Sequence, residues 1–169
     1  ESSKTSLLRA RIVGVVSNHE YGGVRERAER LGVQFFYLPN TFVGDEYQYV
    51  AQHTRADFFA LSGWLKLVKG MHPGTKFNPR TVFNIHPGPL PKFGGYGFYG
   101  HFVHEAVIAA YRRGELTHSE VCMHFVAAGE GVQDYDRGPV FFRRKVEIRP
   151  DDTAETLGAR VNEAEHFSQ

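Results

Sequence analysis

Short apolar runs that suit β-strands alternate along this chain with segments of helical periodicity, and this alternation limits the choice of fold more than any other feature. Nearly continuous or alternating apolar residues predict strands at residues 11–17, 34–38, 58–61, 81–85, 120–126 and 138–148. Apolar residues at helical spacing predict helices at residues 24–31, 45–54, 100–113 and 152–165. We expect Gly32 and Gly114 to end two of these helices, and Asp152 with Glu155 to form a capping pair that opens the last one.

A succession of strand, helix, strand and helix is typical of an α/β sheet whose first strands run parallel. The last two predicted strands are joined by a loop without a helix, so we expect them to be antiparallel. Within residues 120–126, strand periodicity places Val121 and Met123 on one face and Cys122 and His124 on the other. At 169 residues, the chain is long enough for one domain with a substantial core.

Composition argues against several classes of function. The formal net charge is +1, so no basic field favours a nucleic-acid partner. No apolar run is long enough to span a bilayer, which predicts that the chain has no membrane partner. The single cysteine, Cys122, cannot form an internal disulfide and favours a reducing compartment, so we expect a cytoplasmic protein. No set of residues predicts a metal site.

Two polar side chains stand at the end of the strand predicted at residues 81–85. Asn84 and His86 are two positions apart and should therefore share a face of the strand, and the prolines that follow stiffen its exit. A rigid pair of hydrogen-bond donors at a strand end is one way in which an enzyme stabilises negative charge that develops on oxygen. The alternative interpretation is an ordinary polar strand end beside a turn.

Ligands of open α/β sheets bind at the carboxyl ends of the strands, where we expect the loops at residues 62–64, 84–100 and 127–138. The last of these loops carries Asp134 and Asp136. Because a carboxylate beside an imidazole can orient the ring and accept a proton, one of these aspartates with Asn84 and His86 would suit the attack of an amine on a carbonyl carbon. The amide and imidazole would stabilise the oxyanion, and the carboxylate would take the proton of the amine. Alternatively, both aspartates are ordinary acidic loop residues.

Several motifs resemble those of the folate-dependent formyltransferases, in the branch that serves purine biosynthesis. Asn84-Ile85-His86-Pro87, followed by Leu90-Pro91-x-Phe93-x-Gly95, resembles the family signature, and Asp136-x-Gly138 resembles its Asp-x-Gly. Other similar stretches are residues 61–67, 94–100, 103–108, 124–126 and 164–166. The resemblance implies a three-layer, Rossmann-like α/β fold with a mostly parallel sheet and antiparallel C-terminal strands.

The resemblance also implies a function and a set of site residues. It implies transfer of a formyl group from 10-formyltetrahydrofolate to the amine of 5'-phosphoribosylglycinamide, without a metal. Asn84 and His86 would polarise the formyl oxygen, and Asp136 would manage protons. The folate would be bound by Leu61, Trp64, Leu65 and Asp134, with backbone groups of residues 127–136 at the pterin edge. The acceptor would be met by Pro87, Gly88 and Glu165. Trp64 and Leu65 could instead be core residues, and Glu165 a solvated helix residue.

Three features depart from the family pattern. The strand at residues 11–17 resembles the second strand of the family, and residues 1–8 contain no glycine to form the phosphate-binding loop that follows the first. We therefore expect a single formyltransferase-like domain over residues 1–169 that lacks the first strand and is truncated at both ends. Residues 127–133 look inserted, so Asp134 is an alternative to Asp136, which we prefer because Gly138 follows it in family order. Gly88-Pro89 also departs from the family pattern.

Other functions remain open within the same fold. A formyltetrahydrofolate hydrolase would use water in place of the amine, and a sugar-amine formyltransferase would use another acceptor. A relative without activity would keep only folate binding. The sequence leaves the oligomeric state open, with a homodimer as one option.

Overall fold

The computed structural model describes residues 10–39, 44–129 and 131–168. The chain divides into two compact units, one with the described residues of 1–57 and 70–77 and the other with those of 58–69 and 78–169. The expectation for residues 1–8, that they supply no phosphate-binding loop, lies outside the described residues.

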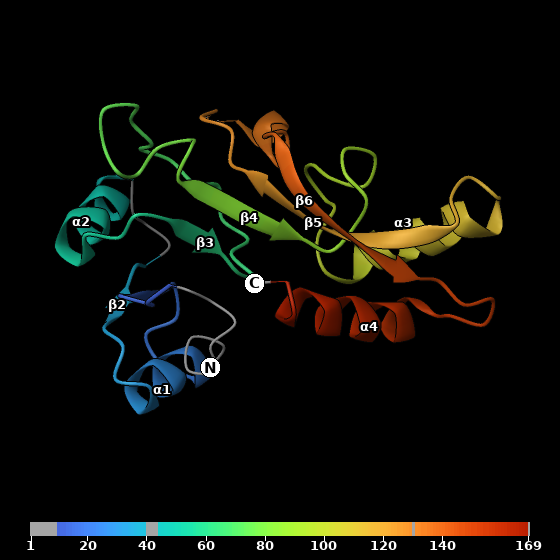
Figure 1. Cartoon of the computed structure of the whole chain (residues 1–169), viewed down its shortest axis with the longest axis horizontal. Coiled ribbons are helices and arrows are strands. Elements are labelled where there is room, and N and C mark those ends of the chain that lie inside the picture. The colour runs from blue at the N-terminus through green and yellow to red at the C-terminus, as the bar shows by residue number, and fades with distance from the viewer. Residues whose placement is uncertain (1–9, 40–43, 130, 169) are drawn as a thin grey trace. The chain divides into compact units, whose positions relative to one another are not determined.

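The described elements follow the predicted alternation of strands and helices (Figure 1). The strands are β1 (Val15–Ser17), β2 (Phe35–Tyr37), β3 (Phe59–Leu61), β4 (Val82–His86), β5 (His118–Phe125) and β6 (Val140–Glu147). The helices are α1 (Gly23–Arg30), α2 (Asp45–Thr54), α3 (His101–Arg112) and α4 (Ala154–His166), with a 3-10 turn, η2, at Val132–Asp134. The α/β fold class predicted from the sequence is confirmed.

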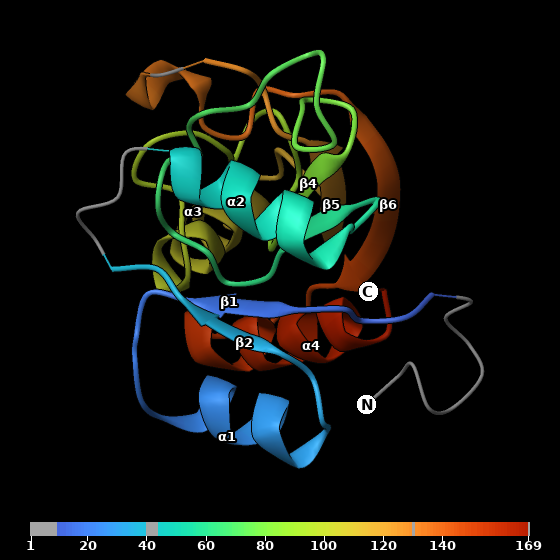
Figure 2. The ribbon, with the colours of Figure 1, turned by 90° about the vertical axis from the view of Figure 1, so that its left-hand side faces the viewer.

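The first unit is built on a parallel pair of strands, β1 and β2, with α1 alongside the pair (Figure 2). The strand predicted at residues 11–17 begins only at Val15, because Val15–Ser17 are the residues that pair with Phe35–Tyr37. Gly14 lies just before β1, where an added Cβ would come within 3.0 Å of the Thr54 side chain and 3.1 Å of the Phe36 ring. A larger residue would therefore disturb the packing of α2 against β2.

The second unit contains a four-stranded sheet in the order β3-β4-β5-β6. β3 and β4 are parallel, whereas β5 is antiparallel to both β4 and β6. This confirms the antiparallel arrangement predicted for the last two strands. Asn84 pairs with His124, and Ile85 pairs with Met123. Because side chains alternate between the two faces of a strand, the first pair lies on one face of the sheet and the second pair on the other.

The core of this unit lies between the sheet and two helices, α3 and α4, which pack on each other (Figure 1). Its buried residues include Ile85, Val103, Val107, Val121, Met123, Val146, Leu157 and Val161. Burial of each large apolar side chain contributes roughly 1.5–3 kcal/mol. The two helices approach closely at Gly158, where an added Cβ would lie 2.9 Å from Cδ2 of His104. A glycine in the middle of α4 is thus explained by this packing.

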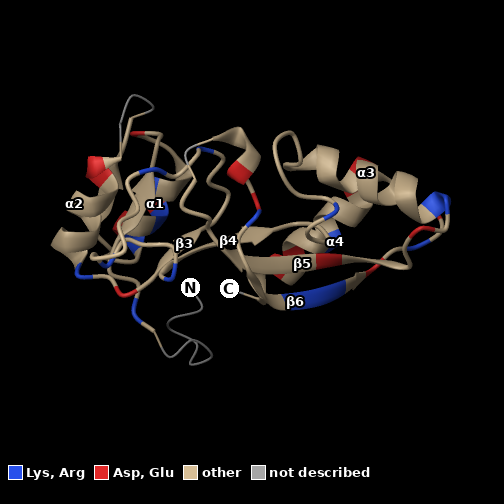
Figure 3. Ribbon diagram, turned by 90° about the horizontal axis from the view of Figure 1, so that it is seen from above, with Lys and Arg blue, Asp and Glu red and all other residues tan. Residues whose placement is uncertain are grey.

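Where β5 and β6 pair, a buried cysteine and two charged residues lie against the proline-rich loop. Figure 3 shows the basic stretch of β6 beside an acidic residue of β5. Arg143 Nη1 donates to Glu120 Oε2 at 2.6 Å, and Arg143 Nη2 donates to the carbonyl of Leu90 at 3.0 Å. The side chain of Cys122 lies between them and is fully buried. Arg143 therefore ties the loop after β4 to the strand pair β5-β6.

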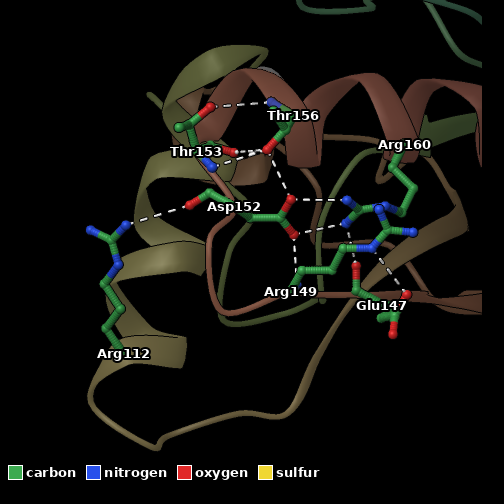
Figure 4. Close-up of polar contacts among 7 residues, drawn as sticks. All are labelled: Arg112, Glu147, Arg149, Asp152, Thr153, Thr156 and Arg160. Atoms are coloured by element: carbon green, nitrogen blue, oxygen red, sulfur yellow. Dashed lines mark hydrogen bonds and ion pairs between the residues drawn. The ribbon is translucent and has the colours of Figure 1, made fainter.

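The start of α4 differs from the prediction. Thr153, not Asp152, is the N-cap, and it forms a reciprocal capping box with Thr156, not with Glu155. Figure 4 shows why Asp152 does not serve as the cap: its carboxylate accepts hydrogen bonds from Arg160, from the backbone N–H of Arg149 and from the Thr156 hydroxyl. Asp152 fixes the connection between β6 and α4 rather than the first turn of the helix.

Candidate active site

Strands β4 and β5 bring three polar side chains to the same face of the sheet. Asn84 and His86 alternate along β4 as predicted, and His124 is the partner of Asn84 in the register with β5. Asn84 Nδ2 lies 3.2 Å from His124 Nε2. His86 and His124 are only 3% and 2% exposed, respectively. The site therefore starts from three side chains that the strand register holds in fixed positions.

Asp136 reaches this group from the loop between β5 and β6. Its Oδ1 accepts from Asn84 Nδ2 at 3.3 Å and lies 3.3 Å from His124 Nε2. Its Oδ2 lies 3.6 Å from His86 Nδ1. The sequence hypothesis required amide, imidazole and carboxylate to meet, and the structure brings all three together with a second imidazole.

Two glycines position Asp136. The backbone N–H of Gly95 donates to Asp136 Oδ2 at 3.0 Å. At Gly138, an added Cβ would lie 1.6 Å from the carbonyl oxygen of Phe125, so the chain can return to β6 along this path only with glycine. Asp136 itself has φ of 56°, a left-handed conformation that Asp and Asn tolerate better than most residues. The Asp-x-Gly motif thus has a structural reason in this chain.

Backbone carbonyls fix the orientation of both imidazole rings. His86 Nε2 lies 2.6 Å from the carbonyl oxygen of Phe93, so this nitrogen carries a proton and donates it. His124 Nδ1 lies 2.9 Å from the carbonyl oxygen of Phe125 and donates in the same way. As a result, the remaining nitrogen of each ring, His86 Nδ1 and His124 Nε2, faces the carboxylate of Asp136.

Burial and mutual charge set the protonation of the pair formed by His86 and Asp136. Burial lowers the pKa of His86 below its ordinary value, against the opposing influence of the Asp136 charge and the Phe93 carbonyl. Burial acts to raise the pKa of Asp136, but the contact with His124, the charge that His86 acquires when it is protonated and the N–H of Gly95 outweigh it and lower the pKa. At neutral pH these shifts favour an ionised Asp136 beside an uncharged His86.

A pocket opens on this group of side chains. Asn84, His124 and Asp136 line one part of it, and residues of two loops form the rest: Leu61, Trp64, Lys66, Leu67, Val68, Val126, Ala127, Asp134 and Tyr135. The segment after β3 and the loop before Asp136 therefore form walls of one pocket. His86 is not among the lining residues; it lies behind the carboxylate.

The other predicted site residues lie in different places. Leu61, Trp64 and Asp134 line the pocket, whereas Leu65 does not and is 63% exposed. Asp134 also has a local structural role, because its carboxylate accepts from the backbone N–H of Gly131 at 3.1 Å in the turn η2.

The residues predicted for the acceptor side are further removed from the pocket. Pro87 and Gly88 follow β4 directly, and an added Cβ at Gly88 would lie 2.5 Å from Val103 Cγ1, so packing against α3 accounts for this glycine. Glu165 lies on α4 and accepts from Asn162 within the same helix at 3.5 Å. Burial raises its pKa. None of these three residues lines the pocket.

Sequence reasoning assigned no side-chain role to several residues that line the pocket, among them His124, Lys66 and Tyr135. The pattern of β5 placed His124 on the correct face, but only the cross-strand register shows that it faces Asn84. Lys66 belongs to a stretch that resembles the family pocket, and Tyr135 stands directly before Asp136.

In the described part of the chain, no helix is both long and apolar enough to cross a membrane. In the same residues, no group of three or more His, Cys, Asp or Glu side chains is arranged to hold a metal ion.

Comparison with known proteins assigns the chain to a class. Residues 1–168 match the family described as formyl transferase, and the chain belongs to this family. This member of the family has an α/β fold. Its Asp136 carboxylate contacts Asn84, His86 and His124 on two adjacent strands.

Among its relatives, a phosphoribosylglycinamide formyltransferase of Vigna unguiculata, described as chloroplastic, is 34% identical over 174 residues, which cover 98% of this chain and 52% of the relative. The chain thus spans about half the length of that protein. The crystal structure of a phosphoribosylglycinamide formyltransferase from Brucella melitensis matches with a TM-score of 0.76 at 27% identity, over 99% of this chain and 81% of the other. A formyltetrahydrofolate deformylase from Pseudomonas syringae shares the fold, with a TM-score of 0.72 at 20% identity over 98% of this chain and 51% of the other.

Proposed function

We propose that the protein transfers a formyl group from 10-formyltetrahydrofolate to the amine of 5'-phosphoribosylglycinamide. The observation that carries this proposal is the contact of the Asp136 carboxylate with Asn84, His86 and His124 beside a pocket that Leu61 and Trp64 help to line. Similarity to proteins named phosphoribosylglycinamide formyltransferase supports the choice of acceptor. The proposed chemistry needs no metal, because the attacking group is itself an amine.

In the proposed reaction, the amine nitrogen of the acceptor bonds to the formyl carbon, and the bond from that carbon to N10 of the folate breaks. Asn84 would exchange one of its present N–H contacts for the formyl oxygen and stabilise the oxyanion. The proton lost by the amine would pass to Asp136, directly or through water, and return to N10 as tetrahydrofolate leaves.

The two histidines have distinct places in this scheme. His124 lines the pocket and faces both Asn84 and Asp136, so it can orient the amide and the carboxylate together. His86 contacts Asp136 from the side away from the pocket lining, and its Nε2–H is engaged by the carbonyl of Phe93. In this arrangement His86 acts on the reaction through Asp136, because its unprotonated Nδ1 can take up a proton beside the carboxylate and return it. The role predicted from the sequence, a direct donor to the formyl oxygen, stays a prediction.

The contacts to the acceptor also stay predictions. Pro87 and Gly88 directly follow β4 and its last residue, His86, which supports their assignment to the acceptor side. The raised pKa of Glu165 would let this carboxyl carry a proton closer to neutral pH than an exposed glutamate does. A homodimer and a cytoplasmic location remain expectations from the sequence, and the plant relative is described as chloroplastic.

A pair of matched variants of the full-length protein tests the proposal. Asp136→Asn keeps the size of the side chain and suits the left-handed conformation at this position, so it removes the charge with little change in packing. We expect it to lower kcat by at least 100-fold while the affinity for folate changes little. Asp134→Asn should alter KM for the folate rather than kcat. The opposite pattern would show that Asp134 is the catalytic carboxylate.

The same assay separates the alternative functions. Formate released from 10-formyltetrahydrofolate without an acceptor would indicate the hydrolase, a function held by the Pseudomonas syringae protein of the same fold. Transfer to an amino sugar but not to 5'-phosphoribosylglycinamide would indicate the sugar-amine enzyme. Folate binding with neither reaction would indicate an inactive folate-binding relative.

A further inference from the structure

Tyr135 stands where the two walls of the pocket meet. It lines the pocket directly before Asp136, and Leu67, on the segment after β3, lines the same pocket. Burial raises the pKa of the Tyr135 hydroxyl. The loop before β6 thus brings a partly buried aromatic side chain to the pocket beside the carboxylate.

A second tyrosine reaches the same place from the glycine-rich loop. The ring centroids of Tyr96 and Tyr135 lie 6.4 Å apart, with 57° between the planes of the rings. Tyr96 is 77% exposed, although it carries a large aromatic ring. Its neighbour Gly95 donates to Asp136 Oδ2, so the loop that carries Tyr96 is anchored to the carboxylate of the site. The ring of Tyr96 therefore lies near the carboxylate with most of its surface uncovered.

We propose that Tyr96 and Tyr135 form an aromatic outer part of the pocket and bind an aromatic ring of the folate donor. This inference rests on the proposed function. In a folate, N10 carries the formyl group and is bonded directly to the p-aminobenzoyl ring. With the formyl group at Asn84 and Asp136, an aromatic ring of the donor lies within reach of residues that adjoin Asp136. Rings of this kind pair favourably in offset or tilted arrangements.

The two tyrosines are specificity-determining residues in this proposal, not catalytic residues. In this role their rings gain contact when the donor binds, and their hydroxyls take no part in the proton transfer. Their replacement should therefore raise the Kd and KM of the donor and leave kcat unchanged. A role in shaping the catalytic group would instead lower kcat.

The single tryptophan of the chain, Trp64, lines the pocket and provides the signal for the test. We would titrate the full-length protein with tetrahydrofolate and follow Trp64 fluorescence, and measure kcat and KM for 10-formyltetrahydrofolate on the same samples. Tyr96→Ala removes a ring that is mostly exposed, so the fold should be unaffected. We expect its Kd and KM to rise about threefold to tenfold.

Tyr99→Ala is the matched control. Tyr99 belongs to the same loop and is 49% exposed, but its ring contacts Phe102 rather than Tyr135. We expect this variant to bind tetrahydrofolate as the unchanged protein does. Equal losses in Tyr96→Ala and Tyr99→Ala would refute a specific role for the tyrosine pair.

Two changes at Tyr135 separate its ring from its hydroxyl. Tyr135→Phe keeps the ring and should keep most of the affinity, whereas Tyr135→Leu should lose about as much as Tyr96→Ala. Identical affinities for the two variants would overturn the proposal, because the ring would then contribute nothing. If the unchanged protein shows no response to tetrahydrofolate, the proposed function itself fails; normal binding that is insensitive to both tyrosines refutes only this inference.

Discussion

The buried carboxylate of Asp152 allows a quantitative prediction about stability. Asp152 is 4% exposed, and both of its oxygens accept two hydrogen bonds (Figure 4). Oδ2 accepts from the Arg149 N–H at 2.7 Å and from Arg160 Nη1 at 2.8 Å, and Oδ1 accepts from Arg160 Nη2 at 2.9 Å and from Thr156 Oγ1 at 2.8 Å. Three of these four partner groups can only donate, so Asp152→Asn would turn an NH₂ group toward at least one fixed donor in either orientation of the amide.

The magnitude follows from these contacts. The substitution removes a charge-assisted, bidentate contact with Arg160, which is worth about 1.5–3 kcal/mol. It also leaves at least one donor without an acceptor, at a cost of about 1–3 kcal/mol. The Arg160 side chain is 22% exposed and can turn toward water, which reduces the loss. We therefore expect the free energy of unfolding to fall by about 2–4 kcal/mol, and Tm by roughly 5–12 °C.

Urea and thermal unfolding of Asp152→Asn, followed by circular dichroism, would measure this loss. Asp151→Asn is the matched control, because Asp151 is the exposed neighbour in the sequence and should change the free energy by less than about 0.5 kcal/mol. The hydrogen bond with Arg160 lowers the pKa of Asp152 well below its ordinary value, so its contribution is present above about pH 4 and is lost at lower pH. The difference between Asp152→Asn and the unchanged protein should then shrink in acid. If the two asparagine variants unfold alike at pH 7, the reasoning from donors and acceptors is wrong.

Two further predictions concern glycine packing and buried histidines. Gly138→Ala would place a Cβ 1.6 Å from the Phe125 carbonyl oxygen, so we expect the free energy of unfolding, measured in urea, to fall by about 2–3 kcal/mol. Gly74→Ala is the control, because its added methyl meets open space. Equal stabilities of the two variants would contradict the packing argument. Burial lowers the pKa of both His86 and His104. Below about pH 6.5 the unfolded chain then binds more protons than the folded one, and the free energy of unfolding should fall with pH by up to about 1.4 kcal/mol per pH unit for each histidine. Unfolding at pH 7, 6 and 5 checks this, with a shallower slope expected for His104→Gln; identical slopes would show that His104 is not held neutral.

Local periodicity was sufficient to predict the order of the elements. The pattern of residues 120–126 placed His124 opposite the core-facing Met123, and the structure has this arrangement because each strand must bury one face against α3 and α4. The boundaries were less predictable. Only three residues of the first predicted strand pair with a neighbouring strand. Such pairing depends on contacts between segments distant in the sequence, and local periodicity carries no information about them.

The start of α4 shows a second limit. Asp152 followed by Glu155 has the spacing of a capping pair, but Thr153 and Thr156 have the same spacing one position later. The choice between them depends on Arg160, eight positions after Asp152, which takes the carboxylate away from the helix terminus. A motif defined by spacing alone cannot show that a more distant charge competes for one of its members.

The loop before Asp136 shows why the site can accommodate a change of length. The sequence suggests an insertion at residues 127–133, which would be expected to displace the carboxylate. In the structure, the residues directly before Asp136 form the turn η2, which is closed by the hydrogen bond from the Gly131 N–H to the Asp134 carboxylate. Asp136 is fixed independently of that turn, since Gly138 packs against the Phe125 carbonyl and the Gly95 N–H binds Oδ2. The position of the carboxylate is therefore set by contacts with β5 and the glycine-rich loop, and the length of the preceding loop can change without moving it away from Asn84 and the two histidines.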